Sequence, residues 1–169
     1  MIDYAVFSHK GERDYNEDNI AVAVNPALFT YGFVLADGLG GHGLGADASK
    51  IVADYVSAAV ENTDTVYGLF MDECFDKSQE FLLKEQMRLG CPDAMKSTMV
   101  FLLMDNRKAS WGHIGDSRIY FFRDSQLMEH TRDHSMVQAL VDAKKLKEKD
   151  IRKHPDRSRL LKSMAAQWS

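Results

Sequence analysis

The sequence contains only two cysteines and no long apolar run among its 169 residues. Cys74 and Cys91 lie in unrelated contexts and form no CxxC motif, which argues against a disulfide framework and for a reducing compartment. No stretch reaches the roughly 18 consecutive apolar residues that a membrane span needs, and the N-terminus lacks the basic and apolar regions of a signal peptide. We therefore expect a cytoplasmic protein that does not enter a membrane.

The net charge of −4 is spread unevenly along the chain. Residues 144–162, called the basic segment below, carry nine Lys or Arg against three Asp or Glu. Such a segment binds nucleic acid in some proteins and is a solvated helical face in others. Because no aromatic residue or nucleic-acid motif accompanies it, we expect no nucleic-acid partner.

Hydrophobic periodicity predicts the order of strands and helices. An apolar run at 31–37 is typical of a buried strand, and residues 44–61 switch to helical spacing. The strands are grouped on both sides of a helical pair and do not alternate with helices, which predicts an α+β fold with antiparallel sheets. The other expected elements are strands at 3–8, 19–24, 97–104, 109–114, 118–122 and near 127–130, a helix over 66–88, and helical segments from Asp133 onward, the last from Asp156.

Four acidic residues stand at positions where a carboxylate is costly unless it is used. Asp37 ends the apolar run, Glu17 and Asp18 come just before another strand, and Asp116 lies between two apolar strands. Oxygen ligands that project from strand ends into one pocket suit hard divalent cations such as Mg²⁺, Mn²⁺ or Ca²⁺. Taken singly, each acid is equally well explained as a turn residue or part of a solvated loop.

A glycine-rich stretch, VLADGLGGHGLG at residues 34–45, follows the Asp37 strand. It suits a flexible loop or a turn that cradles phosphate at a helix N-terminus. A Walker-type loop would end in Gly-Lys-Ser/Thr, whereas Ala-Asp-Ala follows here, and the later hairpins contradict a dinucleotide-binding fold. We therefore expect backbone that approaches another group closely beside one carboxylate.

Five motifs occur in an order that resembles the metal-dependent serine/threonine protein phosphatases of type 2C in their bacterial form. The resemblance implies a β-sandwich of two antiparallel sheets flanked by helices, with residues 1–169 as one phosphatase-like domain and 133–166 as a helical, flap-like region. The motifs are GERDYNED at 11–18, VLADGLGGHGLGADAS at 34–49, STMVFLLM at 97–104, WGHIGDSRIYFFRD at 111–124 and TRDHS at 131–135.

The resemblance also implies roles for individual residues at the site. Asp37 matches the aspartate that bridges two metal ions, and Gly38 matches the glycine that lends its backbone carbonyl. Glu17 and Asp18 match acids that support the metals, largely through bound water. Arg13 matches the arginine that holds the substrate phosphate.

Further motif positions complete the expected site. Asp116 matches an aspartate associated with a third, weaker metal, and Thr98, Thr131 and Asp133 match positions near the site. The expected cofactors are two or three Mn²⁺ or Mg²⁺ ions, and the expected substrates are proteins phosphorylated on serine or threonine. The basic segment falls where the family has a variable flap, so we expect it to attract anionic, phosphorylated proteins.

Two features depart from the family pattern. Leu39 follows Gly38, where animal members often carry a histidine and bacterial members commonly have an apolar residue. Two further metal-binding aspartates of the family also have no counterpart, since no Asp follows Asp156. Three interpretations stay open: part of a longer phosphatase, a non-catalytic phosphatase-like binding or regulatory module, or a homodimer in which a second copy completes the sandwich. We expect little or no activity from the chain alone.

Overall fold

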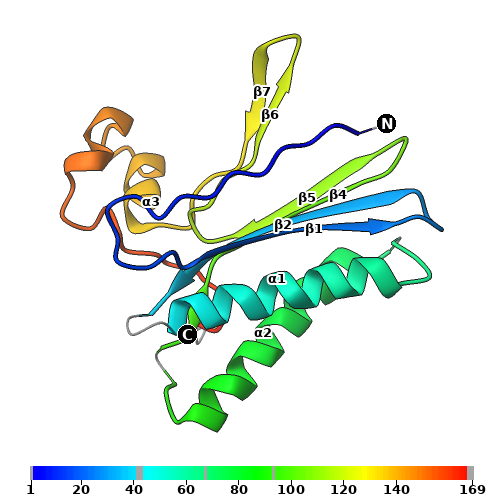
Figure 1. The fold of residues 1–169 in the computed structure, drawn as a ribbon. Coiled ribbons are helices and arrows are strands. Elements are labelled where there is room, and N and C mark those ends of the chain that lie inside the picture. The colour runs from blue at the N-terminus through cyan, green and yellow to red at the C-terminus, as the bar shows by residue number, and fades with distance from the viewer. Residues whose placement is uncertain (1, 41–43, 67, 93, 167–169) are drawn as a thin grey trace.

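The computed structural model describes residues 2–40, 44–66, 68–92 and 94–166, and it contains one antiparallel sheet with two long helices on one face (Figure 1). The strands lie in the order β1–β2–β4–β5, and the short β3 pairs with the end of β2. β2 therefore has a neighbour on each side. The bounds are β1 Asp18–Asn25, β2 Thr30–Leu39, β3 Lys96–Ser97, β4 Met99–Met104, β5 Ala109–Ile114, α1 Leu44–Asn62 and α2 Phe70–Leu89.

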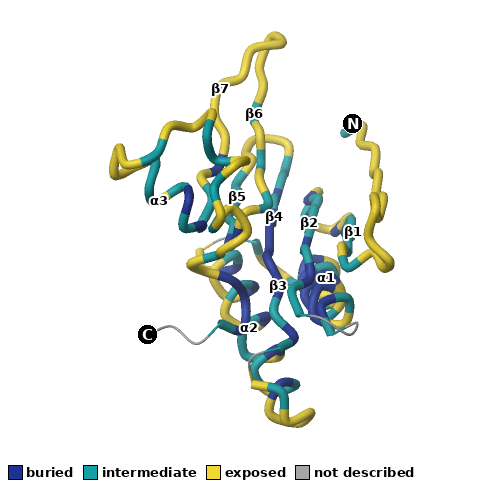
Figure 2. Tube along the Cα trace, turned by 90° about the vertical axis from the view of Figure 1, so that its left-hand side faces the viewer, coloured by how far each residue is buried: buried dark blue, intermediate teal, exposed yellow. Residues whose placement is uncertain are grey.

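The core lies between the sheet and α1, because each presents an apolar face to the other (Figure 2). Val52, Val56 and Val60 recur at helical spacing along α1 and are almost fully buried. A Cβ atom at Gly32 in β2 would lie 2.8 Å from Val60 Cγ2, so α1 rests directly on β2 at this glycine. This contact lies near the C-terminal end of α1.

The N-terminal segment crosses the other face of the sheet without forming a strand. The prediction of a strand at 3–8 is therefore wrong, although three consecutive apolar residues, Ala5, Val6 and Phe7, lie there. Val6 and Phe7 line a hollow of about 310 Å³ together with apolar side chains of the sheet, and Tyr4 packs edge-on against Phe33. The segment lies over the face of the sheet, where its backbone cannot join the hydrogen-bonded ladder.

The second sheet is a two-stranded antiparallel hairpin that projects from the first sheet (Figure 1). It consists of β6, Tyr120–Arg123, and β7, Gln126–His130. The predicted α+β class with two antiparallel sheets is confirmed. Within the described residues, the second sheet consists of this two-stranded hairpin alone. The predicted strand 97–104 is also present, but Thr98 interrupts it between β3 and β4.

The region after residue 133 contains less helix than the sequence predicts. It forms α3, Met136–Asp142, and a 3₁₀ helix, Glu148–Lys153. The helix predicted from Asp156 is wrong, because the chain there makes β-bridges, pairing Leu160 with Ser135 and Met164 with Ser97. Among the described helices none is both long and apolar enough to cross a membrane.

Candidate metal centre

Asp37 lies near the end of β2, directly opposite Asp18 in β1. Its backbone is fully engaged: the N–H donates to Thr98 Oγ1 at 2.9 Å, and the carbonyl accepts from the Thr98 N–H at 2.8 Å and from Ser97 Oγ at 3.1 Å. Its carboxylate is different, because Oδ1 is buried and has no hydrogen-bond partner. A buried oxygen without a partner is costly and marks a place where a cation would bind favourably.

Acidic side chains dominate the electrostatics around Asp37. Burial, and then the negative charge of Asp18, raises the pKa of Asp37 to about 6; Asp116 raises it further, whereas the Arg13 guanidinium lowers it. The pKa of Asp116 is also raised, by partial burial of its carboxyl group and by the charge of Asp133. A divalent cation would offset this repulsion.

The glycines allow backbone to pack on backbone where β2 meets α1. A Cβ atom at Gly38 would lie 2.0 Å from the Gly45 carbonyl oxygen, and one at Gly45 would lie 2.8 Å from Glu17 Oε1. The Gly38 N–H donates to the Glu17 carbonyl at 3.0 Å. The prediction of a close backbone approach is confirmed at these two glycines, and the neighbouring group is the first turn of α1. The stretch 41–43 lies outside the described residues.

Arg13 and Glu17 approach the site from the chain that precedes β1, and Asp18 is the first residue of that strand. Arg13 lies on an exposed turn, near enough for its charge to lower the pKa of Asp37. Asp18 is exposed, whereas Glu17 is partly buried and contacts the start of α1. That Arg13 binds phosphate and that Glu17 and Asp18 support metal ions stay predictions.

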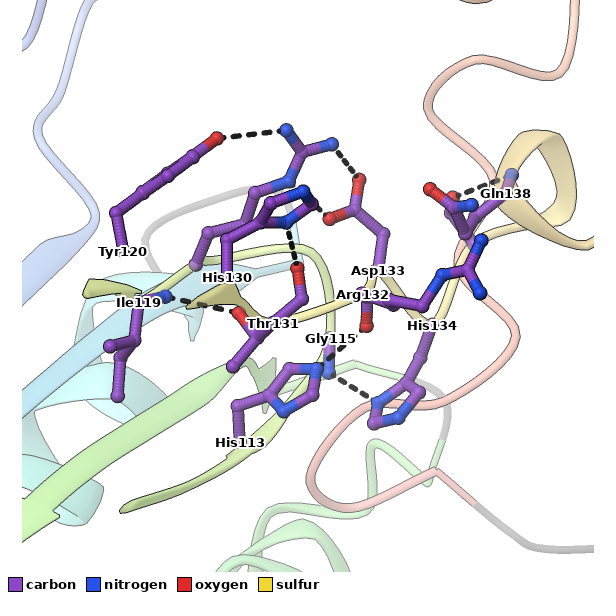
Figure 3. Close-up of polar contacts among 12 residues, drawn as sticks. His113, Gly115, Ile119, Tyr120, His130, Thr131, Arg132, Asp133, His134 and Gln138 are labelled. Carbon is purple, nitrogen blue, oxygen red and sulfur yellow. Dashed lines mark hydrogen bonds and ion pairs between the residues drawn. The ribbon is translucent and has the colours of Figure 1, made fainter. Parts of the chain in front are cut away.

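The loop that carries Asp116 is tied to the chain that follows the hairpin (Figure 3). Thr131 Oγ1 accepts from the Ile119 N–H at 3.0 Å, and the Thr131 N–H donates to the Ile119 carbonyl at 3.0 Å. The His134 N–H donates to the Gly115 carbonyl at 2.9 Å, and the Gly115 N–H donates to His134 Nδ1 at 3.2 Å. Thr131, predicted to line the site, thus closes the base of the loop.

Asp133, also predicted to line the site, forms a two-pronged ion pair with Arg118. Arg118 Nη2 lies 2.7 Å from Asp133 Oδ2, Nε donates to Oδ1, and Nη1 donates to the Tyr120 hydroxyl at 3.0 Å. A planar guanidinium that binds both carboxylate oxygens fixes the orientation of the two side chains. Asp133 therefore orients the Asp116 loop and influences Asp116 through its charge.

The described residues match a hard cation in donor type but do not form a complete ligand cluster. No three Asp, Glu, His or Cys side chains within the described ranges converge closely enough to hold a metal ion. The structure sets Asp37 opposite Asp18 and brings Asp116 near enough to act on it electrostatically. Cations of this kind retain water and accept carbonyl oxygens, so carboxylates alone do not have to fill the coordination shell.

Sequence reasoning missed several residues that hold the site together. Ser97 and Ser117 bond to Asp37 and Thr98, and Ser49 in α1 donates to the Glu17 carbonyl. These serines lie within the quoted motifs or next to them, but their partners are distant in sequence. No periodicity connects such pairs, so only the fold identifies them.

The family model of protein phosphatase 2C matches residues 7–161. The chain is 32% identical over 158 residues to the protein phosphatase PhpP of Streptococcus pneumoniae. This match covers 90% of this chain and 63% of PhpP. It is 29% identical over 170 residues to the serine/threonine protein phosphatase PstP of Mycobacterium tuberculosis. This match covers 97% of this chain and 31% of PstP.

Solved structures share the fold. The serine/threonine phosphatase Stp1 from Staphylococcus aureus matches with a TM-score of 0.86 at 28% identity, over 95% of this chain and 65% of Stp1. The catalytic domain of PstP in complex with two manganese ions matches with a TM-score of 0.77 at 23% identity, over 93% and 64%, which shows the fold alone. The chain spans less than two thirds of each of these relatives. The family resemblance is confirmed: the chain belongs to the protein phosphatase 2C family.

Proposed function

We propose that this chain belongs to a metal-dependent phosphatase that hydrolyses phosphoserine and phosphothreonine in proteins. The observation that carries the proposal is the buried, unpartnered Oδ1 of Asp37, set among Asp18, Asp116 and Arg13. Family membership supports it, because PhpP and PstP are protein phosphatases and Stp1 is a serine/threonine phosphatase. The two manganese ions of the PstP structure support Mn²⁺ as a cofactor, with Mg²⁺ as the other candidate and two or three ions as the expected number.

The proposal assigns a task to each residue at the site. Asp37 and the Gly38 carbonyl would hold the metal pair, with Glu17 and Asp18 supporting it through water. Asp116 would hold a further ion, and Arg13 would bind two phosphate oxygens with its guanidinium group. Bound ions would supply an acidified water as the nucleophile and would offset the charge on the phosphoryl oxygens.

Phosphate release from a phosphothreonine peptide tests this proposal. We expect the chain to bind Mn²⁺ and to release phosphate far more slowly than PhpP, because two aspartates of the family pattern have no counterpart here. EDTA and Asp37→Asn should each abolish that release. Mn²⁺ binding without any phosphate release, both by this chain and by a version extended at its C-terminus, would favour the alternative, a non-catalytic binding or regulatory module. Release that is insensitive to both EDTA and Asp37→Asn would contradict the proposal.

The proposal gives the basic segment a role in attracting phosphorylated proteins. It belongs to the proposed flap-like region 133–166, and Lys144, Lys145, Lys147 and Lys149 are all exposed within it. Neutralising these four lysines should raise KM for a phosphoprotein several-fold at low salt, since exposed charges contribute roughly 0.2–1 kcal/mol each. KM for p-nitrophenyl phosphate should stay unchanged.

A matched variant separates local charge from net charge. It neutralises four exposed cations of the two long helices, which lie on the far side of the sheet: Lys50, Lys77, Lys84 and Arg88. This control should leave KM for the phosphoprotein unchanged although its net charge falls equally. Equal effects of the two variants, or equal effects on both substrates, would remove the basic segment from the proposal.

Two further parts of the proposal concern partners and location. The apolar sheet face beneath the N-terminal segment supports the predicted homodimer, in which a second copy covers that face; sedimentation over a range of protein concentrations tests it. Both cysteines are unpaired, which suits the predicted cytoplasmic location. Nucleic acid and membranes have no role in the proposal.

A further inference from the structure

Thr98 joins the two elements that carry Asp37 and Asp116. It is fully buried in the one-residue gap between β3 and β4. Its hydroxyl accepts from the Asp37 N–H at 2.9 Å and lies 2.9 Å from Ser117 Oγ. One side chain therefore connects the end of β2 with the loop on which Asp116 lies.

The methyl group of Thr98 packs against the backbone of the loop that carries Asp116. A Cβ atom at Gly115 would lie 2.5 Å from Thr98 Cγ2, and Gly115 has a φ of +106°. The loop therefore turns directly over the methyl group at a residue that must be glycine. The other hydrogen bonds of this loop described above run to residues after the hairpin, including the pair between Gly115 and His134.

We propose that Thr98 is a positioning residue that sets the separation between the carboxylates of Asp37 and Asp116, so that both can bind neighbouring cations. The inference rests on the proposed function, because it takes the two acids as metal ligands. Without a bound cation the two carboxylates repel each other, and a movement of the Asp116 loop away from Asp37 would lower this repulsion. The hydrogen bond between the Thr98 and Ser117 hydroxyls, called the hydroxyl bridge below, opposes that movement. The two carboxylates are therefore held at the separation that metal binding needs before a cation arrives.

Two substitutions remove the bridge from opposite sides. Ser117→Ala removes it from the loop and leaves the bond between Thr98 and the Asp37 N–H in place. Thr98→Val removes both bonds, whereas Thr98→Ser keeps the hydroxyl. Calorimetric titration with Mn²⁺ should show about tenfold weaker binding for Ser117→Ala and Thr98→Val, as is typical when a group that orients a metal ligand is lost. Thr98→Ser should bind Mn²⁺ within about twofold of the parent, by the same reasoning.

Controls separate positioning from loss of structure. Ser57→Ala removes an exposed serine hydroxyl from α1 and should leave Mn²⁺ binding unchanged. Thermal unfolding in EDTA reports whether each variant folds, and Ser117→Ala decides the matter if Thr98→Val does not. The double variant should bind Mn²⁺ no more weakly than Thr98→Val alone, because both substitutions break one bridge.

The outcomes distinguish this inference from the function on which it rests. Parent-like Mn²⁺ binding by folded Ser117→Ala would overturn the role of the hydroxyl bridge. A Thr98→Ser variant as weak as Thr98→Val would overturn it too, because serine keeps the hydroxyl and loses only the methyl group. Parent-like binding by Asp37→Asn and Asp116→Asn would instead overturn the proposed metal site. Loss of binding in these two acid variants together with tenfold weakening in Ser117→Ala would support both.

Discussion

Replacing Asp37 by asparagine is expected to stabilise the metal-free protein at pH 8 and to abolish the stabilisation that Mn²⁺ gives the parent. Burial, followed by the charge of Asp18, raises the pKa of Asp37 from 3.8 to about 6. Above that pH the folded chain holds an ionised carboxylate where the neutral acid is preferred. Asparagine has nearly the same shape and carries no charge, so it removes this cost and the metal ligand together.

The pH dependence follows from the direction of the shift. Below pH about 4 the carboxyl is protonated in both the folded and the unfolded chain, and its charge contributes nothing. Between that pH and about 6 only the folded chain keeps the proton, so the stability of the parent falls as the pH rises. Above this range the loss is complete and amounts to at most about 3 kcal/mol, because water still reaches part of Asp37.

Thermal unfolding at several pH values, in EDTA and with Mn²⁺, measures both effects. Parent and Asp37→Asn should unfold at similar temperatures near pH 4 and diverge by pH 8. Mn²⁺ at about 100 times its Kd should add roughly 2.7 kcal/mol to the parent only, and less below pH 6 as protons compete for Asp37. Asp54→Asn, an exposed position paired with Lys50, is the matched control and should change stability little. Parallel pH curves for parent and Asp37→Asn would contradict the expected result.

The sequence predicts the fold best where the hydrophobic pattern and the burial agree. The apolar run at 31–37 becomes β2 in the middle of the sheet, and the helical spacing over 44–61 becomes α1 packed on it. In both cases a local periodicity decides which face is buried. The apolar run within 3–8 fails as a predictor because those residues lie over the face of the sheet and have no strand edge beside them.

The candidate site is predictable in its residues but not in its connections. Asp37 and Gly38 are marked by a motif, and the close approach of Gly38 to Gly45 follows from glycine chemistry. The bond from Thr98 to Ser117 follows from neither, because it depends on how the residue before β4 and the loop after β5 meet in space. The same holds for the fork between Arg118 and Asp133, which joins residues on either side of the hairpin.

Replacing Gly38 by alanine is expected to destabilise the fold strongly, in contrast to Asp37→Asn at the neighbouring position. The added methyl carbon would lie 2.0 Å from the Gly45 carbonyl oxygen and 2.2 Å from its carbon. Both atoms belong to the first turn of α1, where the Gly45 N–H is held by the Gly40 carbonyl. The helix and the strand must therefore separate, which should lower the free energy of unfolding by roughly 3 kcal/mol or more.

Urea unfolding in EDTA measures this loss, and Gly90→Ala provides the control. Gly90 has a φ of +66° and no atom within 4 Å of an added Cβ, so alanine there costs only the strain of a left-handed residue, about 1–2 kcal/mol. A Gly38→Ala variant no less stable than Gly90→Ala would contradict the steric argument. Substitutions at these two neighbouring residues should therefore change the stability of the metal-free protein in opposite directions. Asp37→Asn should raise it at pH 8, and Gly38→Ala should lower it. That opposition is expected if Asp37 is kept for a cation at the expense of stability, whereas Gly38 is required by the packing of α1 on β2.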